Sequence, residues 1–325
     1  MRVTMREVAE RAGVSVKTVS RVVNDEPHIR PETRAQVRAA ITELGWTPNA
    51  SARTLRTGRT GVIGIAVAEL RRPLLAAVVE RLVMELDRHG LHAAVEPTLD
   101  DPARLASVAA QRGHTFDALL AVDAHELPAE VIAAADGPVV RLNVTRWTSG
   151  TLVDGTDTVY ADLDQGAQLA LRHMRVMGRH RAVRIGPGPL AEREEEHGIA
   201  RVDPGRGEVG RVAGYRAAQR ALVEHPGVDA LICGTDEIAL GALAGLHAAG
   251  VEVPSRVAVI GYGDLDEGRF STPSLSTIDP DTVSLARNAV DLVAARLAGT
   301  DRAPSSVAVP VTLVQRESTS AAGAR

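Results

Sequence analysis

The segment that decides the fold is 3–23, which reads VTMREVAERAGVSVKTVSRVV. Its first part, Met5–Ala12, has the apolar spacing of a short helix, with one face made of Val8, Ala9 and Ala12. Gly13 is expected to end this helix, because glycine takes a positive φ without a Cβ penalty. A second helical pattern follows the turn, and its inward face consists of Val19, Val22 and Val23. Two short helices joined in this way predict a helix-turn-helix.

The second helix of such a motif lies in the major groove of DNA, with its first residues on base edges. The residues in that position are Ser15, Val16, Lys17, Thr18, Ser20 and Arg21. Lysine and arginine suit the acceptors of guanine, valine can contact a thymine methyl, and hydroxyls suit phosphates. Ser15 can also cap the helix. Lys17 is the single lysine among 37 basic residues. This usage indicates a contact that an arginine would not fit; a surface lysine without a role is the alternative.

A third helix and a linker complete this first part of the chain. Pro31 at a first-turn position opens a helix that runs to Leu44 and closes at Gly45. In the linker, Asn49 can cap a further helix that Gly58 can end. A helix of barely two turns is unstable alone in water. We therefore expect it to form only when something packs against it.

Charge is distributed unevenly along the chain. Residues 1–60 hold 11 Lys and Arg against 6 Asp and Glu, a net charge of +5, whereas residues 61–325 carry 26 against 35, a net charge of −9. A small basic part on a larger acidic one suits phosphate contact by the basic part alone. A solvated surface without a ligand explains the same counts.

The composition excludes several classes of protein. The 325 residues are 45% hydrophobic and 24% charged, which is typical of a soluble, folded chain of more than one domain. No stretch has the roughly 20 apolar residues of a membrane span, and the N-terminus lacks the apolar core of a signal peptide. The single cysteine, Cys233, excludes an internal disulfide and a multi-cysteine zinc site. Neither a catalytic triad nor metal-ligand spacing emerges, so we predict a cytoplasmic protein without cofactor or metal.

From Gly61 onward, short apolar runs alternate with longer helical patterns. The predicted strands are Val62–Val67, Ala93–Glu96, Ala118–Val122, Val139–Leu142, Val159–Ala161, Ala182–Ile185, Ala230–Cys233, Val257–Ile260 and Leu275–Ile278. The helices between them include Leu74–His89, Asp164–Met177, Ile238–Ala249 and Val283–Leu297. This alternation predicts a parallel α/β fold long enough for two lobes, with ligands beyond the carboxyl ends of the strands. We divide the chain into an all-α head (1–47), a hinge (48–58) and a two-lobed body (59–325).

These segments together resemble the lactose-repressor (LacI/GalR) family. The resemblance is strongest in VTMREVAERAGVSVKTVSRVVND and in PETRAQVRAAITELGWTPNASARTLRTGRTGVIGIAV. It continues through Gly166-Ala167, Thr235–Ala242, Val259–Tyr262 and Pro273–Ile278, and so covers nearly the whole chain. One departure is Arg30, which stands where the family usually has a serine-like cap, so the third helix should start slightly less stably.

The resemblance implies a homodimeric repressor that binds a pseudo-palindromic operator in double-stranded DNA, with a body similar to periplasmic sugar-binding proteins. Base preference would fall on Val16, Lys17 and Arg21. The hinge helix, Asn49–Thr57, would fold on the operator, and Leu55 would wedge into the central minor groove, where an apolar side chain bends DNA. Ordinary packing of a linker helix is the alternative for Leu55. Further DNA contacts are implied at Thr4, Asn24, Asn49 and Ala52.

The effector half departs from the family pattern. The chain has 2 Phe, 3 Tyr and 2 Trp, and Arg72-Pro73-Leu74-Leu75 stands where the family commonly has Asn-Pro-Phe-Phe. The usual Asn-Asp pair is Thr235-Asp236, and Gly263 replaces an aspartate. The remaining cleft candidates are Arg72, Asn143, Trp147, Thr235, Asp236 and Asp264. Both Trp147 and Arg72 have ordinary surface roles as alternatives. These residues fit an anionic or small polar effector better than a neutral sugar.

Residues 187–210 depart further, with Pro187, Pro189, Pro204 and the acidic run 192–196. The family usually has an arginine-bearing helix and a strand here, and we expect the segment to be too short for both. We expect a solvated loop; recognition of a cationic effector is the alternative.

Three functions are compatible with these observations. The first is an operator-binding repressor whose body dimerises and senses a sugar or an anionic metabolite, with the effector and the DNA favouring different states of the hinge. The second keeps the DNA binding but has a degenerate effector pocket. The third is a cytoplasmic solute-binding protein or sugar-handling enzyme, which the body alone would permit but which has no need of a helix-turn-helix.

Overall fold

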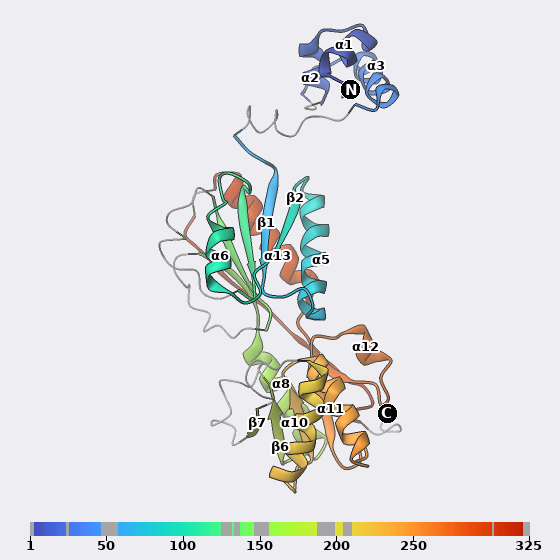
Figure 1. Ribbon diagram of the computed structural model, residues 1–325, viewed down its shortest axis with the longest axis vertical. Helices are drawn as coiled ribbons and strands as arrows, with labels where there is room; N and C mark the ends of the chain where they lie inside the picture. The colour runs from blue at the N-terminus through green and yellow to red at the C-terminus, as the bar shows by residue number, and fades with distance from the viewer. Residues whose placement is uncertain are drawn as a thin grey trace. The chain divides into compact units, whose positions relative to one another are not determined.

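The computed structural model divides into two compact units, Met1–Thr60 and Gly61–Arg325, which we call the head and the body (Figure 1). The described residues are 3–23, 26–46, 58–124, 132, 137–145, 156–186, 199–203, 210–300 and 302–320. Five predicted site residues lie outside this set: Asn24, Asn49, Ala52, Leu55 and Trp147. Most of the predicted hinge, 47–57, is likewise outside it. Among the described residues, no helix is long and apolar enough to cross a bilayer.

The head contains the three predicted helices: α1 (Met5–Ala12), α2 (Val16–Val23) and α3 (Pro31–Leu44). Gly13 and Gly45 follow α1 and α3 with φ of 66° and 59°, the left-handed conformation that favours glycine. A separate small core holds the helices together, and it includes the buried side chains of Val8, Val19 and Val37. The predicted helix boundaries and inward faces are therefore confirmed.

The helix starts in the head differ in their caps. Thr4 and Glu7 form a reciprocal capping box at α1, in which the side chain of each residue bonds to the backbone N–H of the other. The Oγ of Ser15 accepts from the backbone N–H of Thr18 at 3.1 Å, which caps α2 as predicted. Arg30 precedes α3 and makes no side-chain cap hydrogen bond, as its side chain predicts; the weaker start of this helix stays a prediction.

The body has two lobes, each built on a six-stranded sheet. The first sheet has the order β11-β5-β4-β3-β1-β2, and its strands are all parallel. They are β1 (Val62–Val67), β2 (His92–Pro97), β3 (Ala118–Val122), β4 (Val139–Asn143), β5 (Asp157–Ala161) and β11 (Ser306–Val309). Helices α5 (Pro73–Arg88) and α13 (Thr282–Leu297) cover one face, where Ile63 and Ile65 point, and α6 (Pro102–Ala109) covers the other, where Ala66 points (Figure 1).

The second sheet has the order β12-β10-β9-β8-β6-β7, and β12 alone is antiparallel to its neighbour. Its strands are β6 (Ala182–Ile185), β7 (Ala200–Val202), β8 (Ala230–Cys233), β9 (Ala258–Tyr262), β10 (Ser276–Asp279) and β12 (Thr312–Val314). Its helices are α8 (Leu163–Val176), α10 (Arg211–Glu224), α11 (Asp236–Ala248) and the short α12 (Asp266–Arg269). The two-lobed α/β prediction is confirmed.

The described chain passes between the lobes in three places: between β5 and α8, between β10 and α13, and between β11 and β12. One hydrophobic core extends across both lobes. It joins residues of α5 and α13 in the first lobe to residues of α8 and β9 in the second. The lobes therefore share buried apolar surface as well as covalent links.

The expectation for residues 187–210 is wrong in one respect. Strand β7 lies inside this segment and pairs in parallel with β6 through Ala200, Arg201 and Val202. The segment is therefore not a solvated loop throughout. Edge pairing needs only three residues here, and Val202 is buried in the second-lobe core.

Helices α10 and α11 lie side by side (Figure 1) and approach closely because glycines stand at their contact. A Cβ at Gly241 would overlap the backbone carbonyl of Arg211, and a Cβ at Gly214 would overlap that of Ile238. Backbone atoms cannot move aside as the end of a flexible side chain can. Substitution at either glycine must therefore push the two helices apart.

We expect Gly241→Ala to lower the free energy of unfolding by about 3 kcal/mol, because overfilling a packed contact forces backbone shifts. Urea unfolding followed by circular dichroism measures this loss. The matched control is Ala244→Ser on the exposed side of the same helix, with an expected change of about 0.5 kcal/mol or less. Equal stability of Gly241→Ala and the unmodified chain would contradict the close helix contact.

Candidate DNA-binding surface and effector cleft

The exposed face of α2 carries the residues predicted to read bases. Val16 is 45% exposed and Lys17 is also exposed, while Val19 and Val22 on the opposite face are buried. Ser20 and Arg21 lie one turn further along the same outward face and are half-buried. An ammonium, a branched apolar group and a guanidinium thus stand on one face of a helix that the head core holds rigidly.

Not all of these side chains are equally available. Lys17 has no hydrogen bond or ion pair within the part of the chain that the structure describes. The Arg21 guanidinium instead bonds to the Glu26 carboxylate, with 3.0 Å between Nε and Oε2. A base contact by Arg21 has to compete with this pair, whereas one by Lys17 does not.

Three hydroxyl groups that were predicted to contact DNA, those of Thr4, Ser15 and Thr18, form hydrogen bonds within the head. The Oγ atoms of Ser15 and Thr18 lie 2.9 Å apart and share the cap of α2. The Thr4 hydroxyl donates to Glu7 at 2.8 Å, and hydrogen bonds from the backbone and side chain of Thr4 lower the pKa of Glu7. These hydroxyls position the helices first, and a phosphate contact by any of them would be additional.

The first-lobe half of the cleft is built around Asp123, at the carboxyl end of β3. Asp123 is fully buried, has a φ of 46°, and accepts from the backbone N–H of Val144 at 2.6 Å and from the hydroxyl of Thr145 at 2.5 Å. The predicted Arg72 donates to the same hydroxyl at 3.2 Å. Asn143, also predicted, is buried at the end of β4 beside this group. Sequence reasoning missed Asp123 and Thr145.

The second-lobe half contains the predicted pair Thr235 and Asp236. Thr235 caps α11 by accepting from the backbone N–H of Ile238. Asp236 is fully buried and accepts from the hydroxyl of Thr277 at 2.6 Å and from the backbone N–H of Leu265 at 2.8 Å. Burial raises the pKa of Asp236 to about 6, against the opposing effect of these hydrogen bonds.

Asp264, the third predicted acid, is held by two arginines. Its carboxylate oxygens lie 2.5 Å from Nη2 of Arg316 and 3.1 Å from Nη2 of Arg269. The Asp264 backbone has a φ of 48°, which is uncommon for a residue with a side chain. Arg316 comes from the segment after β12, and sequence reasoning missed it because its contact spans 52 positions.

The two halves of the cleft touch. The hydroxyl of Tyr262, at the end of β9, donates to the backbone carbonyl of Val144 in the first lobe at 2.6 Å. Glu237 of α11 is half-buried in the second lobe; burial raises its pKa, and the positive charge of Arg72 from the first lobe opposes that shift. The positive charge of Arg72 thus acts on the second lobe, while the other polar groups described on each side find their hydrogen-bond partners within their own lobe.

The raised pKa of Asp236 makes a testable prediction about stability. A carboxyl group whose pKa is higher in the folded than in the unfolded chain disfavours folding once it ionises. The contribution of Asp236 to the free energy of unfolding should therefore fall by about 3 kcal/mol at most as the pH rises from about 4 to about 6. Asp236→Asn removes this titration, and an amide can still bond to the Thr277 hydroxyl.

Urea unfolding of both proteins at several pH values between 4.5 and 7.5 tests this expectation. The stability of Asp236→Asn relative to the unmodified chain should rise up to about pH 6 and then level off. Parallel curves would show that Asp236 does not titrate in this range.

Two cavities lie away from these groups. One has a volume of about 490 Å³ at the far end of the second lobe, and one of about 230 Å³ borders Asp157 in the first lobe. Neither is lined by any of the five predicted effector residues that the structure describes. Within the described residues, no group of three or more His, Cys, Asp and Glu could hold a metal ion.

Comparisons with known proteins cover both units. Residues 4–49 match the family model described as bacterial regulatory proteins, lacI family, and residues 188–319 match the periplasmic binding protein-like domain. The HTH-type transcriptional repressor PurR of Escherichia coli O1:K1 / APEC is 31% identical over 337 residues, 97% of this chain and 96% of PurR.

Two solved structures extend these matches. The Lac repressor dimer bound to operator and the anti-inducer ONPF superposes with a TM-score of 0.82 at 25% identity, over 98% of this chain and 99% of that one. The complex of the transcriptional regulator CelR with cellobiose gives a TM-score of 0.68 at 26% identity, over 98% of this chain and 100% of that one.

Proposed function

The chain belongs to the lacI family of bacterial regulatory proteins and is a DNA-binding transcriptional regulator, and we propose that it represses genes by reading its operator mainly through Val16 and Lys17. The observation that carries this proposal is the outward face of α2. There, the single lysine of the chain is exposed and has no partner among the described residues. Because the ammonium of Lys17 has no such partner, it breaks no hydrogen bond or ion pair with the described residues when it binds a base or a phosphate.

We propose that this repressor acts as a dimer, as a solved relative does. The Lac repressor structure above is a dimer on its operator. In our proposal, two copies of this chain place one α2 each in successive major grooves of a pseudo-palindrome. Residues 48–58 form the hinge and Leu55 the minor-groove wedge. The relatives are transcriptional regulators and not enzymes. This chain likewise acts by binding, in the cytoplasm and at the nucleoid.

Lys17→Ala tests the central contact. We expect it to lower discrimination between operator and mismatched DNA by about 1–3 kcal/mol, the usual value of a base contact. Fluorescence anisotropy with labelled upstream DNA, across a salt series, measures it. Lys17→Arg is the matched control, because it keeps the charge and changes the shape.

The two variants separate a base contact from a phosphate contact. If Lys17 contacts a base, Lys17→Arg should also lose discrimination between operator and mismatched DNA, while the salt dependence of its DNA binding stays unchanged. A phosphate contact predicts full discrimination by both variants and a smaller salt dependence for Lys17→Ala only. The second pattern would refute base reading by Lys17.

We further propose that an anionic or small polar effector acts at the cleft, where Arg72, Asp236 and Asp264 gather. Each of these groups is bonded to a neighbour within its own lobe, which supports a model in which the ligand replaces internal partners, since an inserted anion would take over the Thr145 contact of Arg72. The same bonding also favours a second candidate, a regulator whose pocket is degenerate. Thermal-shift screening of pooled metabolites, with Arg72→Ala as the control variant, separates the two. A metabolite-dependent shift that Arg72→Ala abolishes supports an effector site, and no shift supports the degenerate pocket.

A further inference from the structure

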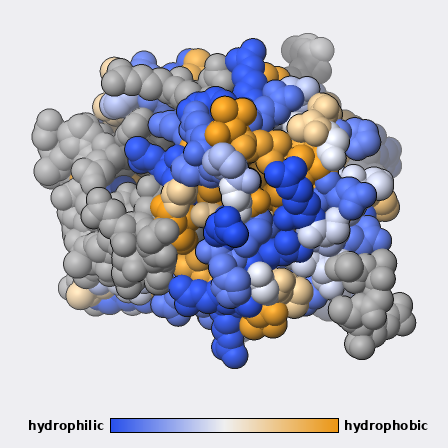
Figure 2. Space-filling view, turned by 90° about the horizontal axis from the view of Figure 1, so that it is seen from below, coloured by the Kyte–Doolittle hydropathy of each residue, from blue (hydrophilic) through white to orange (hydrophobic). Residues whose placement is uncertain are grey.

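The cavity of about 490 Å³ lies at the end of the second lobe where strands β6 and β8 begin, opposite the cleft at their carboxyl ends. Its walls come from the last turns of α8, the first residues of β6, the start of β7 and the connection from α10 to β8. Figure 2 views the body from this end and shows apolar surface in the middle of the face with hydrophilic residues around it. The volume lies within the range of pockets that hold small organic molecules, about 300–1,000 Å³.

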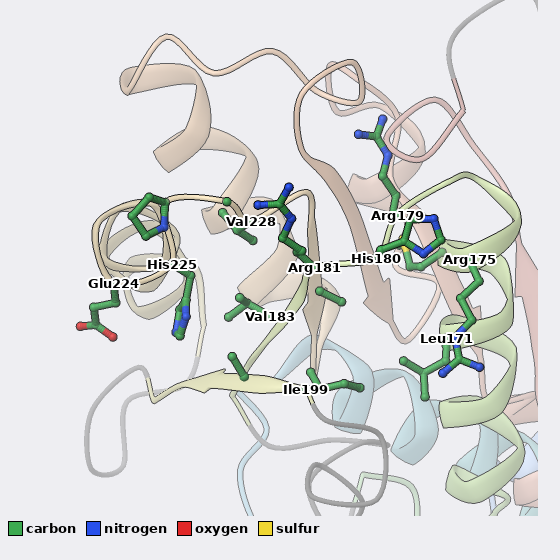
Figure 3. Close-up of a pocket in the computed structure, with 15 residues that line it drawn as sticks. Leu171, Arg175, Arg179, His180, Arg181, Val183, Ile199, Glu224, His225 and Val228 are labelled. Atoms are coloured by element: carbon green, nitrogen blue, oxygen red, sulfur yellow. The ribbon is translucent and has the colours of Figure 1, made fainter.

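One wall of this cavity is apolar. The side chains of Leu171, Met174, Val183 and Val228 line it and belong to the buried interior, and the half-buried Ile199 extends this wall. Figure 3 shows Val183 and Ile199 between the helix that carries Leu171 and the segment that carries His225. Apolar area of this kind favours a ligand with a hydrocarbon or aromatic body.

The rim is positively charged, although the body as a whole is acidic. Arg175, Arg179 and Arg181 surround the opening. Neither Arg175 nor Arg181 has an ion pair or hydrogen bond from its side chain among the described residues. Arg179 donates to the backbone carbonyls of Pro254, Ser255 and Arg256, which carry no net charge, and its buried Nε has no acceptor in the described part of the chain. The three guanidinium charges are therefore not neutralised by these contacts.

The acids near the rim are already engaged. Glu224 lines the cavity, but its carboxylate accepts from Nε of Arg220 at 2.9 Å. Asp229, beside the cavity, accepts at 2.9 Å from the backbone N–H groups of His180 and Arg181. The described surroundings of the opening thus offer an anion more positive than negative charge.

Gly227 leaves room for one rim arginine. A Cβ at this position would overlap Nη1 of Arg181, so the guanidinium lies directly against the backbone of the connection from α10 to β8. Gly227 does not have the positive φ that would by itself call for glycine. The missing side chain is therefore explained by the space that Arg181 occupies.

We propose that this cavity is a second ligand site, distinct from the cleft, that binds a small amphipathic anion. The carboxylate or phosphate group of the ligand lies on the arginine rim, and its apolar body lies against Met174, Val183 and Val228. Charge-assisted bonds to the guanidinium groups supply orientation, and burial of the apolar body supplies the remaining affinity.

Isothermal titration of the full-length protein with octanoate tests the proposal, with octanol as the neutral match and inorganic phosphate as the head group alone. We expect octanoate to bind at least about tenfold more tightly than either comparator, since each lacks one of the two contacts. Arg181→Ala and Arg175→Ala should each weaken octanoate binding about fivefold or more, and Gly227→Ala should do so by displacing Arg181. Replacing octanoate by octyl phosphate distinguishes a carboxylate site from a phosphate site.

Arg172→Ala is the matched control, because it removes one exposed arginine from the same helix without touching the cavity. Unchanged binding by this variant, with loss in the other three, supports the site. The proposal is overturned if octanoate does not bind, if octanol binds equally well, or if Arg172→Ala weakens binding as much as Arg181→Ala. Because no DNA is present, the result is independent of the operator contacts of α2.

Discussion

Removal of residues 1–60 is expected to abolish operator binding and to leave the body folded. The head and the body are separate compact units, and the head core shares no residue with the body cores. The deletion takes away Lys17 and the whole of α2, and what remains has a net charge of −9, which repels phosphates. We expect the affinity for operator DNA to fall at least about 10³-fold, which is the lower limit of the usual ratio between specific and non-specific affinity.

Anisotropy with operator DNA, light scattering and thermal unfolding together measure this result. The truncated protein should elute as a dimer and keep the melting temperature of the body transition in the full chain. Residual sequence-specific binding would place a DNA contact in the body. A lowered body melting temperature would show that the head stabilises it.

The second large effect is expected from Arg296→Ala. Asp157 is buried, with 2% of its surface exposed, and its carboxylate lies 2.7 Å from Nε and 3.3 Å from Nη2 of Arg296. Ser305 donates two further hydrogen bonds to the same carboxylate. Removing Arg296 leaves the buried charge of Asp157 without its main partner, and this should lower the free energy of unfolding by about 3–5 kcal/mol. Urea unfolding of the body transition measures the loss.

Arg302→Ala is the control for this prediction. The Nη2 atom of Arg302 lies 3.8 Å from the same carboxylate, but the side chain is 38% exposed. We therefore expect Arg302→Ala to lower the free energy of unfolding by about 1 kcal/mol or less. Similar losses in both variants would mean that the buried bidentate geometry is not what stabilises Asp157.

The same pair predicts how stability depends on pH. Burial alone would raise the pKa of Asp157, but the hydrogen bonds from Arg296 and Ser305 outweigh it, and the pKa is lowered overall. The stabilisation is therefore fully present above the unfolded value of about 3.9 and is lost as the pH falls through the folded pKa. The difference between the unmodified chain and Arg296→Ala should shrink in acid.

The head could be predicted from the sequence almost residue by residue, because its boundaries are local. Gly13, Pro31 and Gly45 each fix a helix end through backbone conformation alone. The strands that were missed depend on distant partners instead. The short β7 forms on the edge of β6, and β11 pairs with β5 through Ser306 and Thr158, far apart in the chain. These strands, and the likewise missed β12, have only three or four residues, too few for apolar spacing to identify them.

The candidate sites divide in the same way. The outward face of α2 follows from helical spacing, and Asp236 and Asp264 follow from their places after strands and from the family resemblance. Asp123, Thr145 and Arg316 could not be found, because their importance lies in hydrogen bonds across the fold. The arginine-rimmed cavity is a further case, since its walls come from three separate segments, 171–183, 199–200 and 224–228.

The three passages between the lobes have a consequence for how the protein is made. The sheet of the first lobe receives its edge strand β11 only from residues 306–309, and that of the second lobe receives β12 only from residues 312–314. A ribosome synthesises the chain from its N-terminus at about 5–20 residues per second, and domains with contiguous sequences can fold as they emerge. Here the head can fold early, but neither lobe can complete its sheet until residues 306–314 have emerged from the ribosome. Both lobes therefore finish folding together, well after the head.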